Sequence, residues 1–365
     1  MSYLRTVLRS FFVLQLLPAL ESASEETLIG GQAVLEGVMM RSPHAWGIAV
    51  RKSTGDMATH CEPLDRPSEK RKWLAWPFIR GLVTLGQAMS LGFRALKFSA
   101  NVLLAGLPQE EKKKDKVSSP SQATAIAETP QTQKQEEKAP ELSGWVIAIN
   151  MIISVGFFIF MYKFVPLLAA TELNKTWSAL SNNVVFNLVD GVIRLVLFLL
   201  FIWGISLFAD IRRVYEYHGA EHKTVFAYEA QRDIPSIKFT QQFSTYHPRC
   251  GTSFLMTIML ISILVYAAFP ITASGIRTGI FNHLFWYRFG LRVLLLPVIA
   301  SVSYEMIRFS AKHGRSLFAI LTKPGLWMQR ITTKQPKDDQ VECAIKALDE
   351  AMTLEKTRGG ELVIA

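Results

Sequence analysis

The 365-residue chain has little charge and little cysteine, and each shortage excludes a class of protein. Only 19% of its residues are charged, against about 25% in an average soluble domain, and half are hydrophobic. This balance argues against one large soluble domain and favours membrane-embedded helices. The three cysteines, Cys61, Cys250 and Cys343, are far apart, which excludes a disulfide framework. Reduced thiols, or one thiol that binds metal, are the expectation instead.

Four apolar stretches are long enough to cross a bilayer as helices, which takes about 20 residues each. They run from 145 to about 170, from about 184 to 209, from 252 to about 274 and from about 284 to 307. The second contains Asp190 and Arg194, whose spacing of four predicts a pair on one helix face. Such charges either pair structurally or mark a transport path. We predict a polytopic α-helical membrane protein of about four spans with a small cytoplasmic α+β part.

The distribution of Lys and Arg predicts the orientation in the membrane. The loop between the second and third stretches holds six of them, whereas the other two connections hold one each, Lys175 and Arg277. The segment 308–337 adds seven basic residues and no acidic one. Both termini are therefore expected on the inner side. The basic segment is expected to contact the bilayer through anionic lipid or, alternatively, a ribosome or translocon.

Outside these stretches, the chain divides by composition into further parts. The glycine-rich segment 28–75 contains an alternating stretch and a Ser-Thr-Gly-Asp turn, which predict a small cytoplasmic β element. Residues 76–107 have the periodicity of an amphipathic or interfacial helix, and 108–143 have the composition of a disordered linker. Residues 1–27 are expected to form an N-terminal arm, and 308–365 a basic cytoplasmic tail with an amphipathic helix.

The loop 210–251, within the four-span domain 144–307, carries the residues best suited to chemistry. In the segment YHGAEHKTVFAYE, His218 and His222 are one helical turn apart, the spacing at which two histidines on a helix can bind one metal ion. Glu221 completes the order His-x-x-Glu-His, in which a glutamate moves protons on metal-activated water. Glu221 is therefore a candidate catalytic residue.

Two histidines are too few for stable zinc binding, so further ligands are expected from the segment YHPRCGTS. His247 and Cys250 stand directly before the third apolar stretch, whose inner end is expected near that of the second. A divalent ion, with zinc the best match to these nitrogen and sulfur donors, is the predicted cofactor. Four protein ligands would make a closed structural site, and three would leave a position for catalysis. A hydrogen-bonded network without metal is the third interpretation.

A second candidate region is the N-terminal segment GGQAVLEGVMMR. Glu36 is expected on the same side of the membrane as the histidines, where it is a second candidate catalytic residue. A turn followed by a buried strand explains the segment at least as well, and its glycines do not match a phosphate-binding loop.

In their order, GGQAVLEGVMMR, EYHGAEHKTVFAYE, HPRCGTSF and KPGLWMQRITTKQPKDDQVECAIKAL resemble one bacterial integral-membrane family, the domain of unknown function 1385. The resemblance covers roughly residues 28–350 apart from the linker. It implies a bacterial inner-membrane protein and a metal-dependent enzyme, without implying a substrate. The motif positions that it singles out are Glu36, Arg41, His218, Glu221, His222, Glu229, His247, Arg249 and Cys250.

Two classes of function therefore remain open. One is a metal-dependent enzyme that hydrolyses a substrate at the cytoplasmic membrane surface by means of metal-activated water. The other is a non-enzymatic membrane scaffold or membrane-protein biogenesis factor, in which a structural metal site supports a basic face that docks a ribosome, a translocon or another partner.

Overall fold

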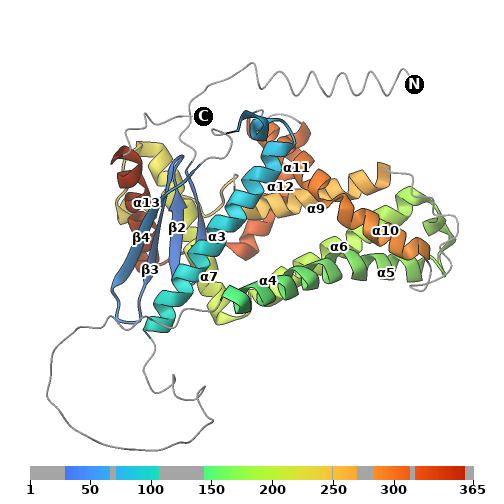
Figure 1. Cartoon of the computed structure of the whole chain (residues 1–365), viewed down its shortest axis with the longest axis horizontal. Helices are drawn as coiled ribbons and strands as arrows, with labels where there is room; N and C mark the ends of the chain where they lie inside the picture. Colours follow the sequence, from blue (N-terminus) through green and yellow to red (C-terminus); the bar gives the residue numbers. More distant parts are fainter. Residues whose placement is uncertain are drawn as a thin grey trace, which may run out of the picture.

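The computed structural model describes residues 29–65, 71–106, 144–248, 250–268, 283–312 and 317–357. A sheet flanked by helices lies at one end of the molecule, and a bundle of long helices lies at the other (Figure 1). The described part of the chain is mostly helical with one small sheet, in agreement with the predicted fold class. The predicted N-terminal arm and linker lie outside the described residues.

The sheet is an antiparallel meander of four strands in the order β1-β2-β3-β4. The strands run Gly30–Val34, Gly37–Arg41, Ala45–Arg51 and Met57–Pro63. Successive side chains of a strand point to opposite faces. Val38 and Met40 therefore join the hydrophobic core on one face, while Met39 joins a second core on the other.

Helices from distant parts of the sequence cover both faces of this sheet. On one face, α7 (Ala209–Gln231) and α13 (Asp338–Thr357) pack against each other and against the strands. On the other face, α3 (Ile79–Ala105) contributes Leu91 and Ala95 to the core. The C-terminal helix therefore completes a three-layer unit that begins with the N-terminal strands.

The bundle contains one helix with a π-helical turn and one helix pair with a sharp bend. Its elements are α4 (Gly144–Ile159), the π-helical turn η3 (Phe160–Phe164), α5 (Val165–Leu173), α6 (Asn183–Ile205), α9 (Gly251–Ala268), α10 (His283–Leu294), α11 (Leu296–Lys312) and α12 (Leu317–Thr332). Short helices, η1 (Lys72–Ala75), η4 (Ser178–Ser181) and α8 (Ile237–Thr240), lie in the connections.

By length and composition, two helices of the described chain can cross a membrane, Ile149–Leu173 and Asn183–Ile205. The α10–α11 pair, bent by 42°, makes a third if both helices form one span, and α9 is apolar but shorter. The structure thus gives two or three candidate spans where the sequence predicts about four. The outer end of the predicted third stretch lies outside the described residues.

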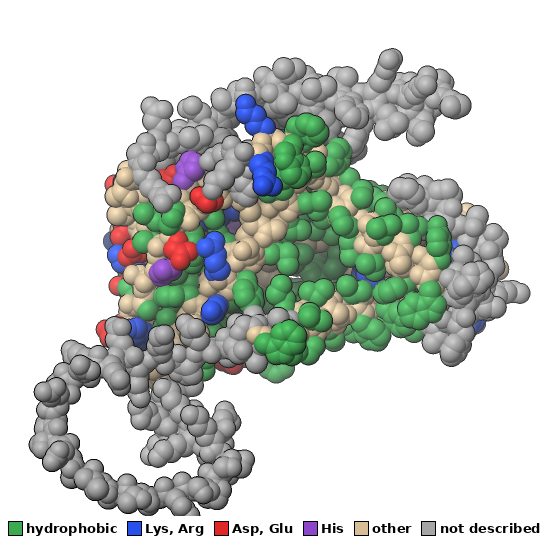
Figure 2. All heavy atoms as spheres, in the orientation of Figure 1, with side chains coloured by type: hydrophobic (Ala, Val, Ile, Leu, Met, Phe, Trp, Pro, Cys, Tyr) green, Lys and Arg blue, Asp and Glu red, His purple; other side chains and the backbone are tan. Residues whose placement is uncertain are grey.

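The surface of the bundle differs from that of the sheet end (Figure 2). Hydrophobic side chains cover the bundle, whereas charged side chains gather over the sheet end. Large apolar residues on α4 and α6, among them Ile152, Leu188, Leu200 and Trp203, are more than half exposed. Because exposed apolar area of this extent is unfavourable in water, the bundle is compatible with a lipid surrounding.

Candidate metal centre

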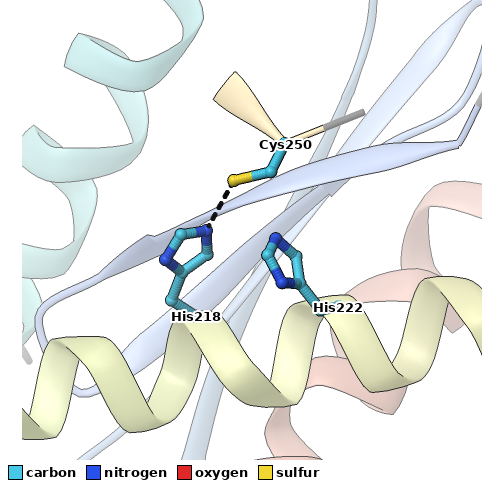
Figure 3. A group of neighbouring side chains, drawn as sticks. All are labelled: His218, His222 and Cys250. Carbon is cyan, nitrogen blue, oxygen red and sulfur yellow. Dashed lines mark hydrogen bonds between the residues drawn. The ribbon is translucent and has the colours of Figure 1, made fainter. Parts of the chain in front are cut away.

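Three donor side chains converge where α7 passes the start of α9 (Figure 3). They are His218 and His222 of α7 and Cys250, and their candidate ligand atoms all lie within 4.8 Å of one another. The Cys250 Sγ atom is 3.3 Å from His218 Nε2. Tetrahedral zinc, with bonds of about 2.0 Å to nitrogen and about 2.3 Å to sulfur, separates such atoms by roughly 3.5 Å. The observed spacing therefore fits one shared ion.

Backbone carbonyl groups fix the orientation of both imidazole rings. His218 Nδ1 lies 2.9 Å from the carbonyl oxygen of Thr332, and His222 Nδ1 lies 2.5 Å from that of Thr245. Because a carbonyl oxygen only accepts, the proton of each neutral ring belongs on Nδ1, and Nε2 keeps its lone pair. Almost every metal-binding histidine donates its other ring N–H to an acceptor such as a backbone carbonyl.

Gly219 allows the connection between α12 and α13 to approach α7 closely. A Cβ atom at this position would lie 2.0 Å from the carbonyl oxygen of Lys334. Lys334 also donates its backbone N–H to the carbonyl oxygen of Tyr215, at 2.9 Å. The glycine between the two histidines therefore lets the segment that follows Thr332 lie against the helix that carries His218.

A buried side chain of α12 holds the loop that carries Cys250. Gln329 Oε1 accepts a hydrogen bond from the backbone N–H of His247, and its Nε2 donates to the carbonyl oxygen of the same residue, both at 2.8 Å. The same Nε2 donates to Ser253 Oγ at 2.8 Å. Sequence reasoning does not single out Gln329, Thr245 or Thr332. For Gln329, the available signal is a polar side chain within an apolar helical stretch.

His247 lies beside the three donors and is not part of their group. Its ring centroid is 5.6 Å from that of His222 and 4.6 Å from that of Phe226. Burial lowers the pKa of His247 to about 4, although the charge of Glu221 acts in the opposite direction. His247 is therefore neutral near pH 7. The structure thus assembles three of the four predicted ligands, with the fourth as their neighbour.

Glu221 occupies the same turn of α7 on the side of strand β1. Its Oε2 atom is 3.5 Å from His222 Nε2, and a Cβ atom at Gly31 would meet its Cγ atom at 2.7 Å. Burial alone would lower the pKa of His222, but Glu221 and a hydrogen bond with Cys250 outweigh burial and raise it. A buried carboxylate next to one ligand atom, and outside the group of three, is well placed to exchange protons there.

Glu36, the other candidate catalytic residue, pairs with α7 ahead of the histidines. It occupies the β1–β2 turn with φ +52°, where its Oε1 accepts a hydrogen bond from Arg213 Nε at 2.6 Å. Its second oxygen lies 3.4 Å from the hydroxyl of Tyr217. Glu36 is therefore placed to anchor the turn to α7. The remaining motif positions are Arg41 at the end of β2, Glu229 near the end of α7, and Arg249, which lies outside the described residues.

Comparison with known sequences assigns the chain to a family. A family described as a protein of unknown function, DUF1385, matches residues 76–354, which include all three donors. The chain belongs to the DUF1385 family. It is also similar to "Uncharacterized protein YqhQ" of Bacillus subtilis (strain 168), with 31% identity over 328 residues, covering 89% of this chain and 92% of the relative. No solved structure matches it.

The DUF1385 match confirms the family resemblance and covers three of the four motifs, since GGQAVLEGVMMR lies before residue 76. It extends across both the bundle and α13. The descriptions of the family and of the Bacillus relative assign neither an activity nor a ligand.

Proposed function

We propose that this protein is a metal-dependent membrane enzyme in which His218, His222 and Cys250 hold a zinc-like divalent ion. The observation that carries the proposal is the convergence of these donors, with both Nδ1 atoms already bonded to carbonyl oxygens. Because three protein ligands would leave the fourth position of such an ion open, the ion would supply Lewis-acid activation of a water molecule or a substrate oxygen there. Hydrolysis is the reaction class that this arrangement supports best.

Each surrounding residue has a defined part in this proposal. Cys250, which directly precedes α9, supplies the sulfur ligand. Glu221 takes a proton from the attacking water and delivers it to the leaving group. His247, neutral and packed between His222 and Phe226, shields the ligands from solvent.

The position of the donors supports action at the inner surface of a bacterial membrane. Candidate span α6 ends at Ile205 and α7 begins at Ala209, while Cys250 directly precedes apolar helix α9. The donors thus lie where the bundle meets the sheet end. Arg308, Lys323, Arg330 and Lys337 of the same region are exposed, which supports a cytoplasmic side next to anionic lipid headgroups.

Metal analysis of the purified full-length protein is the first test. We expect stoichiometric zinc in the wild type, its loss in Cys250→Ser and His222→Ala, and its retention in Glu221→Gln. Cys61→Ser removes a thiol outside the group and should retain the metal, so it is the matched control. A wild-type protein that takes up no metal during reconstitution would overturn the proposal.

Cobalt(II) substitution tests whether the fourth position is open. Azide should change the visible spectrum of the cobalt protein if an exogenous ligand can bind the ion. Glu221→Gln should keep the cobalt spectrum but alter its pH dependence, because the proton acceptor is lost. A spectrum that azide leaves unchanged would contradict the enzymatic role and support a structural ion.

A structural ion in a membrane scaffold or biogenesis factor is the second candidate function. It is favoured by the way the group joins α7 to the loop before α9 and, through the Thr332 carbonyl, to the end of α12. A ribosome or translocon would then dock on the basic face. This alternative predicts salt-dependent co-sedimentation with ribosomes that is weakened in Arg330→Gln/Lys337→Gln, whereas the enzyme predicts none.

A further inference from the structure

A second buried polar group lies inside the helix bundle, towards the end of α9 remote from Cys250. It consists of Lys163 of η3, Asp190 and Arg194 of α6, Tyr266 of α9 and Arg292 of α10, and is called the basic cluster below. None of these residues is more than 7% exposed. None of these residues belongs to the candidate metal centre.

One carboxylate serves two guanidinium groups in the basic cluster. The two oxygens of Asp190 accept hydrogen bonds from Arg194 Nη2 and Arg292 Nη1, each at 2.5 Å. Lys163 Nζ donates to the hydroxyl of Tyr266 at 3.1 Å. The Tyr266 ring centroid lies 5.1 to 5.4 Å from all three cationic groups. Within the described ranges, Asp190 is the one carboxylate in an ion pair with these cations.

Positive charge is therefore in excess in a buried position. Arginine does not lose its proton in proteins, so Asp190 can offset only one of the two guanidinium charges. A protonated Lys163 adds a further positive charge. Charges inside an apolar bundle are strongly unfavourable unless they are paired, and those that persist commonly serve a ligand or ion. A bound anion would supply the missing negative charge.

Two irregularities of the helices occur at the basic cluster. Lys163 lies in η3, a π-helical turn of the kind often found at functional sites. The carbonyl oxygen of Tyr162 in this turn accepts a hydrogen bond from Arg194 Nε at 3.0 Å. α10 and α11 bend by 42° just after Arg292, whose carbonyl oxygen accepts from the Tyr266 hydroxyl at 2.9 Å. Interrupted helices in a bundle commonly line binding sites.

From the excess charge and the two interruptions, we propose that the basic cluster binds a phosphate group. Two guanidinium groups and the amino group of Lys163 match the several oxygens and the double charge of phosphate better than those of a singly charged carboxylate. Figure 2 shows a hollow between α6 and α9, lined by hydrophobic side chains with Lys or Arg atoms beside it. In this proposal, the acyl chain of a lipid would occupy this apolar hollow. The phosphate belongs either to a lipid headgroup or to a soluble anion. The proposal does not depend on the metal ion.

Thermal unfolding of the full-length protein in an uncharged maltoside detergent tests the proposal. The three probes are dioleoyl phosphatidate, inorganic phosphate, and dioleoylglycerol, which has the same acyl chains and no phosphate. We expect phosphatidate to raise Tm and dioleoylglycerol to leave it unchanged. A rise with inorganic phosphate alone would support a soluble source of the anion. Equal effects of the two lipids, or no effect of either phosphate probe, would overturn the proposal.

Variants separate binding from folding, because each shift is measured from the variant's own ligand-free Tm. Lys163→Gln should lose most of the shift, and Asp190→Asn should enlarge it because a competing negative charge is removed. Lys175→Gln is the matched control, since Lys175 is 38% exposed and pairs with Glu172, and it should keep the full shift.

Equal shifts in Lys163→Gln and Lys175→Gln would show that the basic cluster is only structural. A smaller shift in Asp190→Asn than in the wild type would lead to the same conclusion. If Asp190→Asn does not fold, the comparison of the two lysine variants decides the question alone.

Discussion

The two buried polar groups of this molecule are opposite in chemistry. Around His218, His222 and Cys250, backbone carbonyls occupy the Nδ1 positions, so lone pairs of nitrogen and sulfur remain. In the basic cluster, the N–H donors have acceptors, but the positive charge of the two guanidinium groups exceeds the single negative charge of Asp190. We therefore propose a cation for the first group and an anion for the second. The two proposals follow from the lone pairs that the first group keeps and from the charge that the second leaves unbalanced.

Helix α9 links the two groups. Cys250 precedes its first residue and Tyr266 lies in its last turn, which places them about 24 Å apart along a helix that rises 1.5 Å per residue. In the two proposals, one helix thus has the metal-binding Cys250 directly before its first residue and contributes Tyr266 to the anion site in its last turn.

Replacing a buried arginine of the basic cluster should have the largest effect on stability. Arg194→Met removes charged hydrogen bonds to Asp190, to the Tyr162 carbonyl and to Ser262, although Asp190 keeps its pair with Arg292. At about 1.5–3 kcal/mol for each charged hydrogen bond, less what the relief of excess charge returns, we expect a loss of about 3–5 kcal/mol in unfolding free energy. Arg213→Met removes the exposed pair with Glu36 and should cost at most about 1 kcal/mol. Denaturant unfolding in detergent micelles measures both. Equal losses would remove the distinction between a buried charge network and a surface pair.

A change at Gly219 should have the next largest effect on stability, and it should also affect the candidate metal centre. Gly219→Ala places a Cβ atom against the Lys334 carbonyl and should cost about 1–3 kcal/mol, as overpacking does. It should also weaken zinc binding, because the segment that follows Thr332 is displaced. Gly86→Ala in α3 is the control, since a Cβ atom there meets nothing within 4 Å. That change should be neutral or stabilising by up to about 1 kcal/mol. Unaltered zinc affinity in Gly219→Ala would separate the carbonyl contact from metal binding.

The sequence predicts more of the candidate metal centre (His218, His222 and Cys250) than of the basic cluster. A spacing of four places His218 and His222 on one helix face, and the position of Cys250 before an apolar stretch brings it near them. The exclusion of His247 depends on Phe226 and on the Gln329 hydrogen bonds. These contacts arise from tertiary packing and leave no periodic pattern in the sequence.

Spacing likewise predicts the pair of Asp190 and Arg194 within α6. It cannot predict that Arg292, 102 positions further along the chain, shares the same carboxylate. The fold shows the same limit, because alternation predicts strands but not that α13 covers them. Charges and a bend inside apolar stretches also make the number of spans hard to read from the sequence, so the four predicted spans remain a prediction.

The buried carboxylate of Glu355, whose oxygens all have hydrogen-bond donors, should have a smaller effect on stability. It serves as a reference for the two buried polar groups. Glu355 accepts hydrogen bonds from Ser42 Oγ at 2.6 Å and from the backbone N–H of His44 at 2.8 Å. Burial alone would raise the pKa of Glu355, but these hydrogen bonds and the His44 ring outweigh it and lower the pKa. The stabilisation is therefore complete above the unfolded pKa of about 4.3 and is lost as the pH falls through the lower folded value.

Denaturant midpoints between neutral and acidic pH measure this contribution. Glu355→Gln should be less stable than the wild type near neutral pH, and the difference should shrink as the solution is acidified. Parallel pH profiles of the two proteins would show that the ionised carboxylate contributes nothing. Such an outcome would weaken the use of hydrogen-bond counts to interpret the other two buried groups.

The smallest expected effect is that of a substitution in one buried polar group on ligand binding at the other. Substitutions so far apart, with no shared partner, normally act additively. Lys163→Gln should therefore retain the zinc content of the wild type, and Cys250→Ser should retain the phosphatidate-induced shift in Tm. Metal analysis and thermal unfolding of the two single variants and the double variant measure this directly. Zinc loss in Lys163→Gln would mean that α9 couples the groups, and that anion binding in the bundle controls the metal-binding end.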